Sequence, residues 1–264
     1  MARIIAIANQ KGGVGKTTTC VNLVSALADM NYRTLLVDLD PQGNASVGCG
    51  INSRELEISA LDVLQAECTI PEALVQVESL GFDVLPSNSD LTAAEVSLLQ
   101  TDEREYRLKK ALEEVAHQYA WIIIDCPPSL NMLTLNALTA ANSVLIPMQC
   151  EYYALEGLAS LLNTIEQVRS SVNPGLEIEG LLRTMFDGRN NLSSAVSDQL
   201  TEHFGERVYR TLIPRNVRVA EAPSHGLPVL RYDPSSRGAL AYIGLAGEML
   251  RRNRKRQMGP GTPG

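Results

Sequence analysis

Cysteine is sparse and scattered in this sequence of 264 residues. The five cysteines are odd in number and no two form a CxxC pair, so the sequence offers neither a disulfide framework nor the ligand spacing of a zinc site. Isolated thiols suit a reducing compartment, where most serve as small buried apolar residues. We therefore expect a cytoplasmic protein, and the apolar fraction of 45% is ordinary for a globular chain with a hydrophobic core.

Long apolar runs are also missing. The N-terminal run from Ile4 to Ala8 is too short for a signal peptide or a membrane span. Near the other end, only Met249 and Leu250 are bulky and apolar before the basic segment RRNRKR, with Met258 alone beyond it. This end has no apolar stripe that could be buried in lipid, so we expect no membrane partner.

The net charge of −7 is unevenly spread. Residues 1–180 contain 10 basic and 23 acidic side chains, a net −13, whereas residues 181–264 contain 13 and 7, a net +6. Such asymmetry points to an anionic partner for the C-terminal third of the chain. An unevenly charged, solvated surface is the alternative that charge alone leaves open.

Short apolar runs alternate along the chain with segments of helical periodicity. The expected strands are Arg3–Asn9, Thr34–Asp38, Phe82–Leu85, Trp121–Asp125, Ser143–Met148, Ile178–Phe186 and Val208–Ile213. The expected helices are 17–29, 59–66, 71–79, 90–99, 103–118, 130–141, 153–172, 192–204 and 237–252. This alternation predicts an α/β fold, a mostly parallel twisted sheet with helices on both faces. We expect a single domain over residues 1–252 and a disordered tail, 253–264, that is first basic and then rich in Gly and Pro.

The segment NQKGGVGKTTT, from Asn9, follows a predicted strand and opens a predicted helix, which is the setting of a phosphate-binding loop. Its backbone amides can cradle phosphates, Lys16 would reach the β- and γ-phosphates, and the Thr17 hydroxyl would bind Mg²⁺. The spacing is unusual, because Gln10 stands where the common motif has glycine and a second lysine, Lys11, precedes the glycines. The expected nucleotide-binding residues of the loop are Gly12, Gly13, Val14, Gly15, Lys16, Thr17 and Thr18.

Carboxylates follow two of the predicted strands. Asp38 and Asp40 end the run TLLVDLD, and Asp125 ends WIIID. Ligands of parallel sheets bind at the carboxyl ends of the strands, and an apolar run closed by Asp is typical of the Mg²⁺-holding carboxylate of P-loop enzymes. Taken alone, the segment Asp40–Gly43 is also a good turn sequence, so the turn reading stays open for Asp40 and Asp38.

With its extra lysine, the loop resembles the deviant P-loop of the MinD/ParA superfamily. The motifs LLVDLDPQGNAS, WIIIDCPPSL, IPMQCEYYALEG, LLRTMFDGRNN and IPRNVRVAEAPSHGLPVLRYDPSSRGALAY resemble those of ParA/Soj partitioning ATPases. The resemblance covers nearly the whole chain, from Ile4 to Leu250. The P-loop begins by residue 10, so we do not expect the N-terminal helix-turn-helix domain of the long plasmid forms, or operator binding.

The resemblance implies an ATP- and Mg²⁺-dependent ATPase with slow basal turnover. Lys11 would be the signature lysine, which reaches the ATP of the partner subunit in a homodimer that forms with ATP and is monomeric otherwise. A second cation acting in cis would be largely redundant, whereas in trans it would neutralise charge only when two loaded subunits meet. Asp40 would orient the attacking water, and Asp38 and Asp125 would support the Mg²⁺ shell.

The resemblance also implies a base pocket, a DNA surface and a protein partner. The base pocket would use Met185, Asp187, Pro214 and Asn216, with residues 151–157 lining the nucleotide or dimer face. Residues 183–237 contain eight arginines and no lysine, and of these Arg189 and Arg218 match positions that bind DNA without sequence preference. A single surface arginine can equally serve in an ion pair. The implied partner is ParB, a centromere-binding protein, and the implied location is the nucleoid.

Three other functions compete. A MinD-like membrane ATPase would need the amphipathic C-terminal helix that this sequence lacks. An electron-transfer ATPase like the nitrogenase iron protein would need cysteines shared across a dimer, and Cys126 has no second cysteine where a cluster would need one. A metabolic P-loop ligase would need an acceptor pocket, which sequence reveals poorly. DNA binding, membrane binding or neither would separate these functions.

Overall fold

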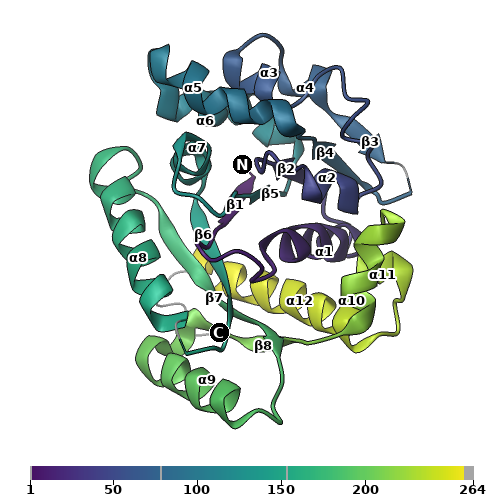
Figure 1. Cartoon of the computed structure of the whole chain (residues 1–264), viewed down its shortest axis with the longest axis vertical. Helices are drawn as coiled ribbons and strands as arrows, with labels where there is room; N and C mark the ends of the chain where they lie inside the picture. Colours follow the sequence, from purple (N-terminus) through teal and green to yellow (C-terminus); the bar gives the residue numbers. More distant parts are fainter. Residues whose placement is uncertain (1, 78, 153, 259–264) are drawn as a thin grey trace.

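One central sheet organises the molecule (Figure 1). The structure is a computed structural model that describes residues 2–77, 79–152 and 154–258. Within these residues the sheet has eight strands in the order β3-β4-β2-β5-β1-β6-β7-β8, and all neighbours are parallel except β3 and β4. The strands are β1 (Arg3–Ile7), β2 (Thr34–Asp38), β3 (Val75–Val77), β4 (Phe82–Leu85), β5 (Trp121–Asp125), β6 (Ser143–Gln149), β7 (Glu177–Phe186) and β8 (Val208–Pro214).

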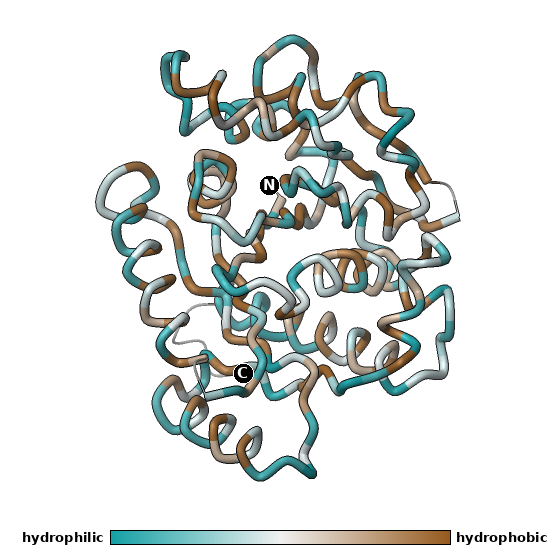
Figure 2. Tube along the Cα trace, viewed as in Figure 1, coloured by the Kyte–Doolittle hydropathy of each residue, from teal (hydrophilic) through white to brown (hydrophobic). Residues whose placement is uncertain are grey.

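Helices cover both faces of this sheet, as the alternating sequence pattern predicts. The hydrophobic and hydrophilic residues mix along the outer helices in Figure 2, as expected for helices that turn one side to a sheet. The α-helices are α1 (Lys16–Asp29), α2 (Asn44–Gly48), α3 (Ala60–Gln65), α4 (Ile70–Ala73), α5 (Ala94–Ser97), α6 (Arg107–Val115), α7 (Met132–Ala140), α8 (Ala154–Ser171), α9 (Asn191–Phe204), α10 (Val217–Glu221), α11 (Val229–Tyr232) and α12 (Arg237–Met258).

The core has two halves, one on each face of the sheet, because successive strand side chains point to opposite faces. In β1, Ile5 and Ile7 pack with α1 and α12, whereas Ala6 packs with the cluster that contains α6, α7 and α8. All of these side chains are fully buried. The central strands therefore read as unbroken apolar runs, which is the pattern of a parallel sheet covered on both sides.

Strand register brings the polar strand ends together. β5 lies between β1 and β2, with Asp125 paired to Ile7 on one side and to Asp38 on the other. The loop from Ala8 to Gly15 leaves β1 at the same edge and leads into α1. Two carboxylates and the glycine-rich loop thus meet at the carboxyl edge of the sheet.

Several expected elements differ from the structure. The helix expected over 71–79 is wrong: after the short α4, residues Val75–Val77 form β3, an antiparallel edge strand on β4. The helices expected over 90–99 and 103–118 are broken into α and 3₁₀ segments, and α2, α10 and α11 were not expected.

The last helix extends beyond its expected end. Helix α12 continues to Met258, so residues 253–258, assigned above to the tail, are helical. Residues 259–264 of that tail lie outside the described residues, as does Tyr153, the expected start of another helix. No helix in the described part of the chain is long and apolar enough to cross a membrane.

Candidate active site

The glycine-rich loop leaves its backbone amides available for an anion. Gly13 and Gly15 adopt positive φ angles of 73° and 85°, a conformation that glycine adopts without strain. Gly15 is the N-cap of α1, and no side chain caps the helix. The first amides of this 14-residue helix therefore lack a side-chain acceptor, and together with the helix dipole they favour a bound phosphate. The Thr184 hydroxyl fixes the loop from β7 by donating to the Val14 carbonyl at 2.7 Å.

The two lysines of the loop have different surroundings. Lys16 is 7% exposed, and its ammonium donates to the Lys11 carbonyl at 3.4 Å. The described residues give Lys16 no carboxylate partner. Lys11 is on the surface, where its ammonium lies 2.5 Å from the Glu151 carboxylate after β6. Lys16 is thus turned into the loop and lacks an anion, whereas Lys11 points outward.

Asp125 has one oxygen held and one left without a partner. The Cys20 thiol of α1 donates to Oδ1 at 3.3 Å, while the buried Oδ2 has no hydrogen-bond partner among the described residues. Burial raises the pKa of Asp125 to about 8, and the neighbouring Asp38 carboxylate adds to the rise, against the opposing effect of Thr17 and Cys20. A buried carboxylate oxygen without a partner is costly unless a proton or a cation meets it.

Asp38 is fully engaged by its own loop. Its Oδ1 accepts a hydrogen bond from the Asp40 amide at 3.1 Å, and its Oδ2 accepts from the amide and hydroxyl of Ser46 at 2.8 and 2.7 Å. Burial nevertheless raises the pKa of Asp38 to about 6. Asp40 is 8% exposed, and its Oδ1 accepts from the Gln42 amide at 3.0 Å. The segment Asp40–Gly43 therefore does form a turn, which the Gly43 amide closes by donating to the Asp40 carbonyl at 2.9 Å, and Asp38 holds the start of that turn through the Asp40 amide.

These groups fit a Mg²⁺ ion that is held jointly by the protein and a nucleotide. The described residues contain no cluster of three or more His, Cys, Asp or Glu that could hold a metal on its own. Mg²⁺ commonly takes one or two protein oxygens and completes its shell with phosphate and water. Asp125 Oδ2 and the nearby Thr17 hydroxyl supply oxygens of the right kind, whereas Asp38 would act through the loop that it organises.

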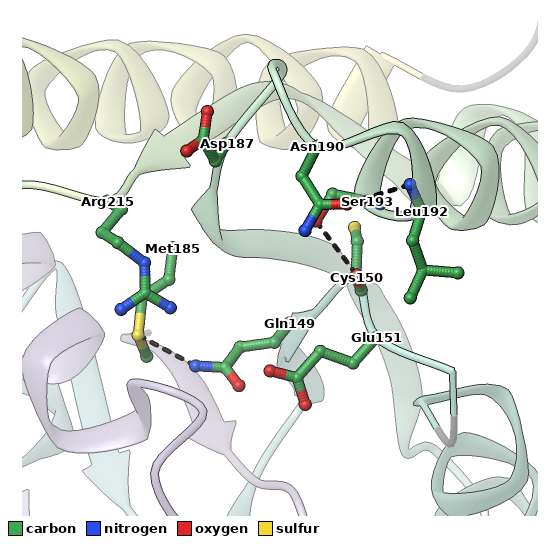
Figure 3. A pocket seen from close by; sticks show the side chains of 9 residues that line it. All are labelled: Gln149, Cys150, Glu151, Met185, Asp187, Asn190, Leu192, Ser193 and Arg215. Atoms are coloured by element: carbon green, nitrogen blue, oxygen red, sulfur yellow. Dashed lines mark hydrogen bonds between the residues drawn. The ribbon is translucent and has the colours of Figure 1, made fainter.

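A pocket of about 160 Å³ opens beside the loop, between the ends of β6 and β7 and the start of α9 (Figure 3). Met185, with a positive φ of 48°, lies against the glycine loop, and the Gln149 amide donates to its sulfur at 2.9 Å. Of the four expected base-pocket residues, Met185 and Asp187 line this pocket. Pro214, the last residue of β8, and Asn216, which caps α10 by accepting from the Val219 amide at 3.2 Å, do not line it.

Both arginines expected to contact DNA make ion pairs. Arg189 pairs with Asp187 through two side-chain contacts of 2.9 and 2.8 Å, and this pair lowers the pKa of Asp187 to about 2. Arg218 pairs with Glu221 at 2.9 Å and with Asp233 at 3.4 Å. The Arg189 side chain is 91% exposed and that of Arg218 is 53% exposed, so a DNA phosphate could reach either guanidinium.

Sequence reasoning missed Cys20, Ser46, Ser87 and Gln149 as site residues. Ser46 lies inside a quoted motif, eight residues after Asp38, but nothing in its spacing shows that the chain folds back on that carboxylate. Ser87, after β4, and Gln149, at the end of β6, follow strands whose order in the sheet the sequence does not state. A search for polar residues at the end of every predicted strand would have found both.

Known proteins place this site in a family. A family model described as an AAA domain matches residues 2–178. The chromosome partitioning protein ParA of Caulobacter vibrioides is 53% identical over 257 residues, which cover 97% of this chain and 96% of that protein. The sporulation initiation inhibitor protein Soj of Bacillus subtilis is also 53% identical, over 94% of this chain and 98% of Soj. The chain belongs to the ParA/Soj family. The resemblance carried by the sequence motifs is thereby confirmed.

Solved structures support the fold of this ParA/Soj chain. A Mycobacterium smegmatis protein described as cobyrinic acid a,c-diamide synthase, solved with bound ADP and magnesium, superposes with a TM-score of 0.86. It is 39% identical, and the match covers 97% of each chain. The expected α/β fold with a mostly parallel sheet is confirmed.

Proposed function

We propose that this ParA/Soj chain is a DNA partitioning ATPase, in which ATP drives the formation of a sandwich homodimer that binds DNA of any sequence. ParB-stimulated hydrolysis then releases the DNA, so that chromosome or plasmid DNA is segregated over the nucleoid. The observation that carries this proposal is that the two lysines point in different directions. Lys16 is turned into the loop, and Lys11 lies on the surface, where it pairs with the exposed Glu151. A surface lysine on a phosphate loop can serve a second subunit.

The residues take distinct roles in this proposal. Lys16 and the amides of residues 12–18 bind the phosphates, and Thr17 and Asp125 hold Mg²⁺, which would neutralise charge on the phosphate oxygens during transfer. Asp40 orients the attacking water, while Asp38 holds the loop that carries Asp40. Met185 and Asp187, which line the pocket beside the loop, contact the base from one side. Pro214 and Asn216 lie outside that pocket and would contact the base from the β8 end. Arg189 and Arg218 bind DNA phosphates. The ATPase domain, expected over residues 1–252, continues to the end of α12 at Met258.

A metabolic ligase is the second candidate, because the M. smegmatis protein is described as a cobyrinic acid a,c-diamide synthase. The two curated relatives described as ParA and Soj are more similar to this chain, at 53% against 39% identity. The proposal therefore follows the partitioning relatives, and the test below separates the two functions.

The test compares wild-type protein with Lys11→Ala, each with no nucleotide, with ADP and with ATP. DNA binding is measured with two unrelated duplexes, and dimerisation by size-exclusion chromatography. We expect only wild type with ATP to dimerise and to bind both duplexes equally. Lys110→Ala is the matched control, because Lys110 is also an exposed lysine in an ion pair, with Glu103, away from the loop. DNA binding that ignores nucleotide and Lys11 would contradict the proposal, and no DNA binding in any state would favour a ligase.

A further inference from the structure

The main chain of Asp40 is fixed on both sides of its Cα atom by buried partners. Its amide donates to Asp38 Oδ1 at 3.1 Å. Its carbonyl accepts two hydrogen bonds, from the Gly43 amide at 2.9 Å and from the Ser87 hydroxyl at 2.9 Å. In the side chain, Oδ1 accepts a hydrogen bond from the Gln42 amide. No hydrogen bond to Oδ2 is found among the described residues.

Ser46 and Ser87 complete this arrangement. Ser46, in α2, donates through its amide and its hydroxyl to Asp38 Oδ2, and its hydroxyl oxygen accepts from the Ser87 amide at 3.0 Å. Both serines are fully buried. Four buried hydrogen bonds thus connect the end of β4, helix α2 and the loop that carries Asp40. We name Asp38, Ser46 and Ser87 the serine frame.

The frame leaves little room for the loop to move. Gly43 has a positive φ of 62°, and a Cβ atom there would lie 2.8 Å from the Ser87 carbonyl. The Asp40 loop therefore packs directly on the backbone after β4. A displacement of about 1 Å in a catalytic group can cost on the order of 100-fold in rate, so a rigid mount for a water-orienting carboxylate has a clear chemical use.

We propose that Ser46 and Ser87 are positioning residues for ATP hydrolysis, which act through Asp40 by holding its carboxylate where it orients the attacking water. This inference rests on the proposed function. It assigns the two serines no contact with ATP or with the metal. Their removal should therefore slow the hydrolysis step and leave nucleotide binding unchanged.

The test measures single-turnover ATP hydrolysis and the affinity for a fluorescent ATP analogue in Ser87→Ala and Ser46→Ala. We expect hydrolysis to slow by about tenfold or more, with analogue affinity within about twofold of wild type. Ser25→Ala is the matched control: Ser25 is fully buried in α1, and its hydroxyl has no hydrogen-bond partner in the described part of the chain. It should hydrolyse ATP at the wild-type rate. Ser87→Cys keeps a similar size and a weak hydrogen-bond donor, and its hydrolysis rate should fall between those of wild type and Ser87→Ala. It takes the place of the alanine variant if that variant folds poorly.

A double variant distinguishes positioning from a general structural effect. In an Asp40→Ala background, Ser87→Ala should cause no further loss of rate, because the group that the serine positions is gone. An equal loss of rate from Ser87→Ala in both backgrounds would overturn the inference. So would a wild-type hydrolysis rate in both serine variants when Asp40→Ala itself hydrolyses ATP slowly. If Asp40→Ala itself hydrolyses ATP normally, the role of Asp40 in the proposed function fails instead.

Discussion

At the residue scale, three side chains of the candidate site differ in the partners that the described residues give them. Within the described residues, Lys16 is nearly buried and donates to a carbonyl, and Asp125 has a buried oxygen for which no hydrogen-bond partner is found. Lys11 has a partner, Glu151, but both side chains are more than 40% exposed, and such pairs contribute about 0–1 kcal/mol. A phosphate would satisfy Lys16, a cation would satisfy Asp125, and Lys11 could leave Glu151 at little cost.

The raised pKa values of the buried carboxylates predict that the stabilisation of the fold by Mg²⁺ depends on pH. Their pKa values are raised on folding, to about 6 for Asp38 and about 8 for Asp125, so the folded chain keeps protons that the unfolded chain releases. Without metal, this pair therefore stabilises the fold at low pH, and its contribution is lost as pH rises towards about 8. Since Mg²⁺ replaces the proton, the stabilisation that Mg²⁺ adds should grow as pH rises from about 7 to about 8.5.

Thermal unfolding with ADP, with and without Mg²⁺, measures this increment at the two pH values. The phosphate has a second pKa of about 6, so the nucleotide is already ionised across this range. Asp125→Asn should shrink the Mg²⁺ increment and flatten its pH dependence. An increment in wild type that is equal at both pH values would contradict the prediction.

The sequence predicts the place of some of these residues in the site but not the contacts of others. Lys16, Thr17 and Asp125 could be placed together because each occupies a motif position or a strand end in a parallel sheet. The hydrogen bonds from Ser46 to Asp38 could not be predicted, because α2 has only five residues and is too short to show helical periodicity in the sequence. The contact of Lys11 with Glu151 joins residues 140 positions apart, and it depends on β6 lying beside β1.

At the scale of elements, two arginines in the last turns of α12 contact the sheet. Arg252 pairs with Glu248 at 2.7 Å and lies over the Tyr209 ring, 4.0 Å from its centre. Arg256 pairs with Glu179, which is 1% exposed and also accepts from Arg3 at 3.1 Å. Two of the five basic residues in RRNRKR thus hold the helix on the sheet, which gives part of this segment a role in folding.

Removing one of these arginines should cost stability. Arg256→Ala leaves Glu179 buried with fewer donors, and we expect a loss of about 1–3 kcal/mol of unfolding free energy. Arg254→Ala, an exposed position in the same segment, should lose less than about 0.5 kcal/mol. Urea unfolding measures both. Equal losses in the two variants would show that Arg256 does not anchor the helix.

Run length, periodicity and tertiary contacts explain which helices and strands could be predicted from the sequence and which could not. The buried strands were predicted because β-branched apolar runs of about five residues leave little choice in a covered sheet. The end of α12 was missed because apolar periodicity stops near residue 252, while tertiary ion pairs continue the helix to Met258. Strand β3 was missed because three residues are too few to show alternation.

At the scale of the molecule, the positive charge of the C-terminal third depends on which of its arginines are paired with acidic side chains. Of the eight between residues 183 and 237, the described structure records ion pairs for Arg189, Arg218 and Arg231, and holds Arg183 against Ser197 and the Tyr209 carbonyl. It records none for the other four, which are exposed: Arg207, Arg210, Arg215 and Arg237. The described part of the C-terminal third thus carries four exposed arginines with no recorded ion pair, and such groups can bind a polyanion.

DNA binding by variants with ATP tests this surface. If Arg189 and Arg218 each bind one phosphate per subunit, either Arg→Ala change removes two contacts from a dimer and should lower the slope of log affinity against log salt by about 2. Dimerisation with ATP should be unaffected, because neither side chain lies on the glycine loop. Arg33 is an exposed arginine directly before β2, in the acidic part of the chain, so Arg33→Ala serves as the control and should leave the slope unchanged. If both variants keep the wild-type slope, the four unpaired arginines become the better candidates, since their guanidinium groups need not first leave a carboxylate to meet a phosphate.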